Sequence, residues 1–192
     1  MYVWLALLCV ATGLVVALAL QSRALRSELA QVRRDAALPP VGLRVPPVTA
    51  VTLTGDTVVL GRTSQVLLFF TTTCPSCRQA VPLWNQLVRR QPGSPVAFEV
   101  WALSAESFAA TAAFVDSMGF EPQVAIVDTA DFFAYRVGAV PLVVVVSPDG
   151  RVLFRRPGVP SLEALDSIVA APSRTADDSL AGVVSPVSGG RP

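Results

Sequence analysis

Two cysteines, Cys74 and Cys77, form a C-x-x-C motif that carries the clearest chemical signal in the sequence. The apolar run Val66–Phe70 precedes the motif and apolar residues at helical spacing follow it, which predicts a strand-to-helix junction. Unpaired N–H groups and the helix dipole favour a thiolate there, so Cys74 is the expected nucleophile. Pro75 suits the first helical position, because its missing N–H would have no intrahelical partner. Cys77 is expected to be the more buried resolving thiol, with Arg78 adding positive charge nearby.

The composition excludes several other kinds of site. The chain has no histidine, and all 15 basic residues are arginine, which excludes histidine metal sites, catalytic triads, Schiff-base lysines and a P-loop lysine. A structural zinc ion needs more ligands than this pair provides, and Arg78 stands where haem attachment requires histidine. An inert structural disulfide is the alternative, although so short a loop gains little from closure. No metal or cofactor is expected.

The length and the net charge limit the number of domains and the kinds of partner. The chain has 192 residues, 52% of them apolar, which fits one ordinary domain plus an appendage. The formal net charge of +1, with 15% charged residues, gives no electrostatic footprint for nucleic acid.

Residues 1–22 are predicted to form a transmembrane anchor. They contain no charged side chain, and the apolar run from Val3 to Leu20 matches the thickness of a bilayer core. A cleaved signal peptide is the main alternative because Ala17-Leu18-Ala19 is an acceptable cleavage site, but the basic n-region is missing. A lipoprotein at Cys9 is disfavoured, because Leu8 precedes it where a small residue is expected.

The segments after the anchor divide into a stalk, one folded domain and a tail. Residues 23–40 are rich in helix formers and end in prolines, which predicts a stalk or linker. Residues 41–170 begin with a hairpin pattern, alternate between strand and helix patterns, and end in a hairpin at Pro148-Asp149-Gly150 and a helix capped by Ser161. This order predicts an α/β domain whose central mixed sheet is flanked by helices. Residues 171–192 have the composition of a disordered tail.

Two stretches of the domain resemble a known family. LLFFTTTCPSCRQAVP and YRVGAVPLVVVVSPDGRVL are similar to the thioredoxin-like thiol-disulfide oxidoreductases of the TlpA/ResA type, and most similar to the membrane-anchored MauD proteins of methylamine utilisation. The resemblance extends from about Val41 to Val169 and implies a thioredoxin-like fold. Pro82 stands where helices of this fold commonly carry a kinking proline.

Two further residues enter the predicted site through this resemblance. Val140-Pro141 matches the family's cis-proline, which faces the disulfide; an ordinary trans proline at the start of a strand is the alternative. The segment ALSAESF aligns with the family's active-site glutamate, so the resemblance gives Glu106 the role of accepting the Cys77 proton. The alternative for Glu106 is a first-turn position in a helix ending at Met118, next to a Ser104 cap.

The sequence also departs from the thioredoxin pattern. Thr73 stands where thioredoxins usually have tryptophan before the first cysteine. Leu68 occupies the position of their buried acid, so that proton acceptor is missing.

The predicted function is that of a membrane-tethered protein thiol-disulfide oxidoreductase. The resemblance implies protein dithiol or disulfide substrates, such as an apocytochrome or a methylamine dehydrogenase-like partner, and a membrane electron donor or acceptor. A peroxiredoxin-like peroxidase is one alternative, because Thr71 precedes Cys74 as in a T-x-x-C motif, although Leu67 replaces the expected proline. A non-catalytic tethered assembly or chaperone module is the other.

The side of the membrane is the point on which the rules conflict. Arg23, Arg26, Arg33 and Arg34 follow the apolar run, so the positive-inside rule alone would leave the domain in the cytoplasm. Disulfides persist outside the cytoplasm, and the resemblance implies the same side. We therefore expect a single-pass protein of the cell membrane with an extracytoplasmic, periplasmic domain.

Overall fold

The computed structural model describes residues 38–94 and 97–173, together with residues 13, 14, 18, 20–23 and 26. The chain divides into two units at Ala37/Leu38, and the described residues of the first unit are helical. Among the described residues, no helix combines the length and the apolar character that crossing a membrane requires. Most of the anchor predicted over residues 1–22, most of the stalk and residues 174–192 of the tail lie outside the described residues.

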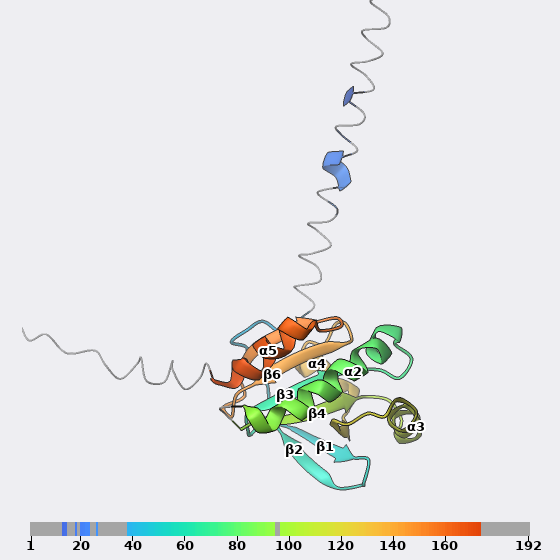
Figure 1. Ribbon diagram of the computed structural model, residues 1–192, viewed down its shortest axis with the longest axis vertical. Helices are drawn as coiled ribbons and strands as arrows, with labels where there is room; N and C mark the ends of the chain where they lie inside the picture. Colours follow the sequence, from blue (N-terminus) through green and yellow to red (C-terminus); the bar gives the residue numbers. More distant parts are fainter. Residues whose placement is uncertain are drawn as a thin grey trace, which may run out of the picture. The chain divides into compact units, whose positions relative to one another are not determined.

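The second unit alternates strands and helices in the predicted manner (Figure 1). The elements are β1 (Val48–Thr52), β2 (Thr57–Leu60), β3 (Gln65–Phe69), α2 (Pro75–Arg90), η1 (Gln91–Gly93), β4 (Glu99–Ser104), α3 (Phe108–Met118), β5 (Gln123–Ile126), α4 (Thr129–Ala134), β6 (Leu142–Val146), β7 (Val152–Pro157), α5 (Leu162–Ala170) and η2 (Ala171–Ser173). Both predicted hairpins form, as β1/β2 and β6/β7, and Ser161 caps α5 by accepting from the Ala164 amide at 3.3 Å.

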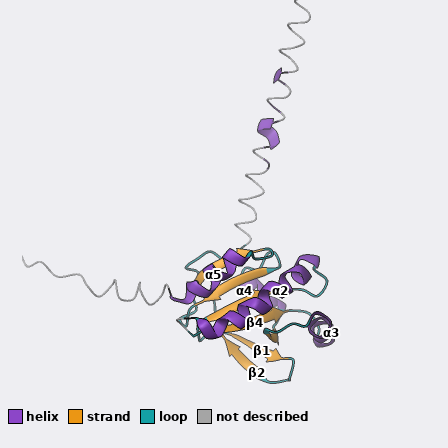
Figure 2. Cartoon of the chain, viewed as in Figure 1, coloured by secondary structure: helices purple, strands orange, loops and turns teal. Residues whose placement is uncertain are grey.

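The strands form one seven-stranded mixed sheet in the order β2-β1-β5-β4-β3-β6-β7. Figure 2 shows the strands in orange, with helices α2 and α5 in purple lying across them. The central strands β3, β4 and β5 are parallel, and β6 is antiparallel to β3. Because the parallel strands end on the same side, the loops after β3 and β4 meet at one end of the sheet. This end carries the C-x-x-C motif, and the prediction of a mixed central sheet is confirmed.

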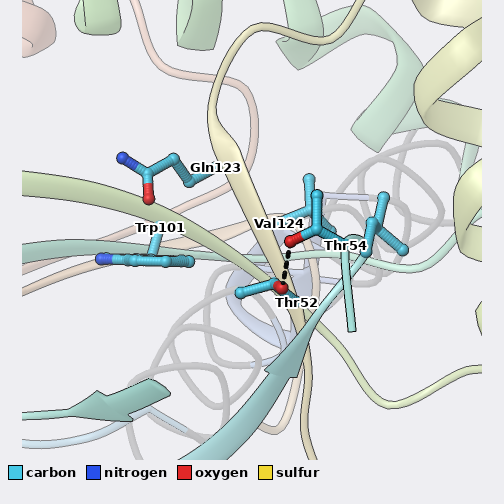
Figure 3. A pocket seen from close by; sticks show the side chains of 6 residues that line it. Thr52, Thr54, Trp101, Gln123 and Val124 are labelled. Carbon is cyan, nitrogen blue, oxygen red and sulfur yellow. Dashed lines mark hydrogen bonds between the residues drawn. The ribbon is translucent and has the colours of Figure 1, made fainter. Parts of the chain in front are cut away.

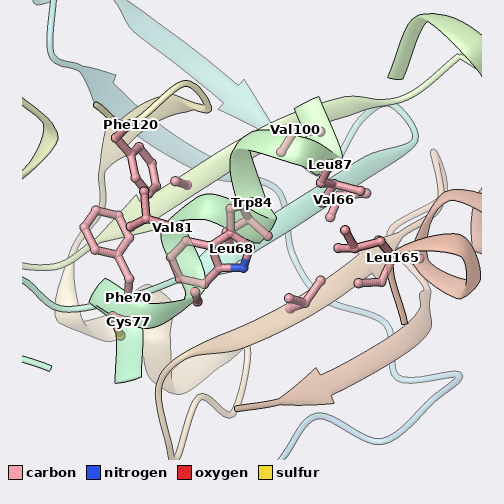
Figure 4. Packing of buried hydrophobic residues seen from close by; sticks show 14 of the residues in the cluster. Val66, Leu68, Phe70, Cys77, Val81, Trp84, Leu87, Val100, Phe120 and Leu165 are labelled. Carbon is pink, nitrogen blue, oxygen red and sulfur yellow. The ribbon is translucent and has the colours of Figure 1, made fainter. Parts of the chain in front are cut away.

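Each face of the sheet packs into its own hydrophobic cluster. Alternate residues of β3 point to opposite sides, with Val66 and Leu68 on one face and Leu67 and Phe69 on the other, and all four are fully buried. Helices α2, α3 and α5 cover the first face, and α4 together with the segment around Leu38 covers the second. Figure 4 shows the first cluster, in which Leu68 lies among apolar neighbours.

The folded unit is longer at both ends than the predicted range of residues 41–170. Leu38 is 3% exposed and packs in the second cluster, whereas Ala171 is fully buried in the first. The prolines at positions 39 and 40 end the predicted stalk in sequence, but the buried side chain before them already belongs to the domain. The first residues of the predicted tail likewise form η2 rather than disordered chain.

Helix α4 ends in a Schellman motif with arginine at the position that usually carries glycine. The Val137 amide donates to the Phe132 carbonyl and the Arg136 amide to the Phe133 carbonyl, while Arg136 has a φ of 51°. We expect Arg136→Gly to raise the free energy of unfolding by roughly 0.5–1 kcal/mol, because glycine adopts this conformation without steric penalty. Urea denaturation monitored by circular dichroism measures the change.

Gly119 provides the matched control for this prediction. It ends α3 with a φ of 58°, and a Cβ built on it would meet nothing within 4 Å. Gly119→Ala should therefore lower the free energy of unfolding by a similar amount, through the backbone alone. Unchanged or reduced stability in Arg136→Gly would show that the arginine side chain makes a compensating contribution.

Candidate active site

The C-x-x-C motif lies at the junction between β3 and α2, as predicted. A tight turn follows β3, closed by the Cys74 amide, which donates to the Thr71 carbonyl at 3.4 Å. Cys74 is the N-cap residue of α2, and its sulfur accepts from the Cys77 amide at 3.3 Å. The Cys77 N–H, which also donates to the Cys74 carbonyl at 3.1 Å, therefore points toward the sulfur at the start of the helix. Pro75 occupies the first helical turn, where its missing N–H would have no intrahelical partner.

The two cysteines are free thiols in different environments. Cys74 is partly exposed, whereas Cys77 is fully buried in the first hydrophobic cluster, with Phe70 and Val81 (Figure 4). Burial is the main cause that raises the pKa of Cys77 to about 12; hydrogen bonding to Cys74 and the charges of Cys74 and Glu106 raise it further, and a hydrogen bond to the Thr71 backbone opposes them. The prediction that Cys77 is the more buried thiol is confirmed.

This asymmetry predicts selective alkylation of the reduced protein. At pH 8, iodoacetamide should modify Cys74 at least about ten-fold faster than Cys77, because Cys74 is open to solvent and Cys77 is both buried and protonated. The pKa of Cys77 is raised, so its thiolate becomes abundant only as the pH approaches about 12. Mass spectrometry of the cysteine peptides measures both rates.

Denaturation in urea is the control for that experiment. Both cysteines should then react at similar rates, because burial no longer separates them. Equal rates in the folded protein at pH 8 would contradict the assignment of Cys74 as the accessible thiol.

Pro141 lies beside the cysteines, as the resemblance implies. The Val140-Pro141 peptide bond is cis, and the Cys74 thiol donates to the Val140 carbonyl across 3.8 Å. The Pro141 carbonyl in turn accepts from the Gly158 amide at 2.7 Å, so the loop after β7 holds the loop before β6. A backbone segment of the α4–β6 loop is thereby placed against the exposed sulfur.

Glu106 lies close to the cysteines but outside any helix. Helix α3 begins at Phe108, and its N-cap is Ser107, whose hydroxyl accepts from the Ala110 amide at 3.4 Å. The alternative of a first-turn position beside a Ser104 cap is therefore wrong. Ser104 instead ends β4, where its buried hydroxyl accepts from the Glu106 amide and from Thr111, each at 3.2 Å.

The Glu106 carboxylate binds the turn that carries Cys74. Its Oε2 accepts from the Thr72 amide at 2.6 Å, and its charge also raises the pKa of Cys77. Sequence reasoning missed the contact with Thr72, because nothing in three consecutive threonines indicates which amide lacks an intra-turn partner. It also treated Arg78 only as a nearby charge, whereas Arg78 Nη2 donates to the Thr72 carbonyl at 3.3 Å.

A shallow pocket lies elsewhere in the domain, toward the start of β5 (Figure 3). It has a volume of about 260 Å³ and is lined by Thr52, Leu53, Thr54, Trp101, Gln123 and Val124. None of the predicted site residues lines it. Within the described part of the chain, no group of three cysteine, aspartate or glutamate residues is arranged to hold a metal ion.

No family model and no curated protein matches this sequence. Solved structures do match its fold. A structure described as thiol:disulfide interchange protein DsbE from Chlorobium tepidum has a TM-score of 0.60 and 24% identity, covering 69% of this chain and 97% of its own. The chain has a thioredoxin-like fold.

Two other solved structures share this thioredoxin-like fold. One, described as a protein disulfide isomerase from Bacteroides thetaiotaomicron, has a TM-score of 0.61 and 18% identity, covering 73% of this chain and 94% of its own. The other, a peroxiredoxin-like protein from Aquifex aeolicus, has a TM-score of 0.55 and 17% identity, covering 70% of this chain and 88% of its own. The predicted thioredoxin-like fold is confirmed, and the structural neighbours include thiol:disulfide oxidoreductases.

Proposed function

We propose that this protein is a thiol-disulfide oxidoreductase that exchanges disulfides with protein substrates through Cys74 and Cys77. One observation carries the proposal: the partly exposed Cys74 sulfur accepts the Cys77 amide at the start of α2, with the buried Cys77 thiol one helical turn away. A nucleophile and a resolving thiol need this arrangement, whereas an inert structural disulfide does not need an exposed sulfur.

In the reducing direction the reaction has two steps. The Cys74 thiolate attacks one sulfur of a substrate disulfide, forming a mixed disulfide and releasing one substrate thiolate. Cys77 then loses its proton and attacks the Cys74 sulfur, which forms the Cys74–Cys77 disulfide and releases the second substrate thiolate. Two electrons pass from the protein to the substrate, and the oxidising direction is the same sequence reversed.

The surroundings of the two sulfurs support different parts of this reaction. The Val140 carbonyl beside Cys74 is a backbone acceptor that an extended substrate segment could pair with. Deprotonation of Cys77 is the demanding step, because burial raises the pKa of its thiol. Glu106 is the carboxylate placed to receive this proton, directly or through solvent, and we propose that role for it.

We further propose that residues 1–22 tether the domain to the cell membrane, with the domain on the extracytoplasmic side. The uncharged apolar run supports the tether, and the persistence of disulfides outside the cytoplasm supports the side. Tethering would raise the local concentration of the domain near membrane partners. A protein dithiol partner such as an apocytochrome, or a methylamine dehydrogenase-like enzyme as in MauD systems, fits this placement.

A thiol peroxidase is the second candidate function. The Thr71 carbonyl accepts from the Cys74 amide, so the T-x-x-C segment forms the turn at the nucleophile, and one structural neighbour is described as peroxiredoxin-like. The first candidate is favoured because Cys77 lies in the first turn of the helix that Cys74 caps, where it is close in sequence and space to the sulfur of a mixed disulfide.

The equilibrium reduction potential of the full chain in glutathione buffers tests the proposal. A reversible dithiol couple is expected; a value near ~−270 mV or lower indicates a reductase, and a value near ~−120 mV an oxidant. Insulin disulfide reduction and peroxide consumption, measured on the same preparation, separate the two candidate functions. The absence of a reversible couple would overturn both and favour a non-catalytic tethered module.

A further inference from the structure

The turn between β3 and α2 leaves the backbone N–H and C=O of one buried residue, Thr72, without partners inside the turn. Its own hydrogen bond joins the Thr71 carbonyl to the Cys74 amide, so the N–H and C=O of Thr72 need partners from elsewhere. Thr72 is only 9% exposed, which limits how well water can replace those partners. The position of the Cys74 sulfur therefore depends on the side chains that form hydrogen bonds with the Thr72 backbone.

Two charged side chains from different elements hold it. Glu106, from the loop after β4, accepts from the Thr72 N–H at 2.6 Å. Arg78, from the second turn of α2, donates from Nη2 to the Thr72 C=O at 3.3 Å. Both contacts join a charged group to the backbone, which makes them stronger than neutral hydrogen bonds.

The Arg78 guanidinium is itself fixed by α3. Its central carbon lies 5.4 Å from the centroid of the Phe114 ring, and Nη1 points to the Met118 sulfur at 3.9 Å. A planar guanidinium can stack on a ring while different N–H groups reach two acceptors, which a lysine ammonium cannot do. Arg78 therefore connects α3 to the turn that carries Cys74.

The other arginines of α2 are engaged differently. Arg89 pairs with Glu121, and Arg90 pairs with Asp166. In the described part of the chain Arg78 forms no such ion pair, and its contacts are the Thr72 carbonyl, the Phe114 ring and the Met118 sulfur. The position of the Arg78 side chain is therefore explained by its hydrogen bond to the turn and not by an ion pair on the surface.

We propose that Arg78 is a positioning residue for disulfide exchange: it holds the Thr72 carbonyl opposite Glu106 and so keeps the Cys74 sulfur against the Val140 carbonyl. The inference rests on the proposed function. An attacking sulfur must align with the disulfide bond that it breaks. If Thr72 is held on one side only, the Cys74 sulfur is less well aligned, which lowers the rate of attack more than the affinity for substrate.

Arg78→Met tests this role, because methionine keeps a long unbranched side chain and removes the guanidinium donors. Insulin reduction by the full chain should show a kcat lowered about ten-fold with KM within about two-fold. Arg89→Met, the matched control on the same helix, should leave kcat unchanged although it loses the pair with Glu121. Arg78→Lys, which keeps the charge but has one donor nitrogen in place of the planar guanidinium, should recover part of the rate.

The outcomes separate this inference from the proposed function. An inactive wild-type chain would overturn the proposed function, and the inference with it. An active wild type with unchanged kcat in Arg78→Met would overturn the inference alone. So would equal losses in Arg78→Met and Arg89→Met, or a loss of kcat explained by a lowered urea midpoint, because either would assign Arg78 a general role in stability.

Discussion

Replacing Cys74 by serine is expected to abolish disulfide exchange, whereas replacing Cys77 by serine is expected to trap its intermediate. Without the Cys74 sulfur no mixed disulfide can form, so the rate of insulin reduction should fall by roughly a thousand-fold or more. Without Cys77 the first attack still occurs, but no neighbouring thiol displaces the substrate from Cys74. Non-reducing gel electrophoresis with a thiol-labelled substrate should then show a stable adduct only for Cys77→Ser.

Cys9→Ser is the matched control, because Cys9 belongs to the predicted anchor and has no part in the proposed chemistry. It should behave as the wild type in both assays. An adduct in Cys74→Ser, or its absence in Cys77→Ser, would contradict the assigned order of attack. Wild-type activity in both single variants would show that another group performs the exchange.

The positions of the cysteines could be predicted because the signals around them are local. The apolar run of β3 and the helical spacing of Val81, Trp84 and Leu87 in α2 are set by each element's own period, and these side chains are buried in the structure. The tight turn at Pro148-Asp149-Gly150 is a local signal of the same kind. The sequence order of such elements then restricts the sheet to few topologies.

The contacts around Thr72 could not be predicted, because they depend on which groups the tertiary structure leaves unpaired. Ser104 and Ser107 are both plausible helix caps in sequence. The pairing of Ser104 with Ile126 extends β4 through Ser104, and its hydroxyl is then buried against Thr111. Only Ser107 is left to cap α3, and this shift of the helix start frees Glu106 to reach the turn.

Glu106→Gln and Glu106→Ala are expected to differ in stability and to agree in the rate of the second step. A glutamine oxygen can still accept from the Thr72 amide, whereas alanine leaves that amide unpaired. We expect Glu106→Ala to lower the free energy of unfolding by about 1.5–3 kcal/mol, the range for a hydrogen bond to a charged group, and Glu106→Gln by about half as much. Urea denaturation of the reduced proteins measures both.

Both variants lack a carboxylate that can take the proton of Cys77. The release of substrate from the mixed disulfide should therefore slow by about a hundred-fold at pH 7 in each, the lower range for general base catalysis. Stopped-flow mixing of the reduced protein with a chromogenic disulfide separates this step from the first attack. The first substrate thiolate is released when Cys74 attacks, and the second is released only when Cys77 attacks the mixed disulfide. The first step should change less in Glu106→Gln, where the turn is still held.

The pH dependence distinguishes a proton acceptor from a residue that only holds the turn. The negative charge of Glu106 raises the pKa of Cys77, so removing that charge should lower the pH at which Cys77 titrates. If Glu106 only repelled the thiolate, the second step would become faster at neutral pH in Glu106→Gln, because more Cys77 would be ionised. If Glu106 takes the proton, the same variant has a lower Cys77 pKa and yet a slower second step. A faster step would therefore refute the proton-transfer role and leave Glu106 as a partner of Arg78 in holding Thr72.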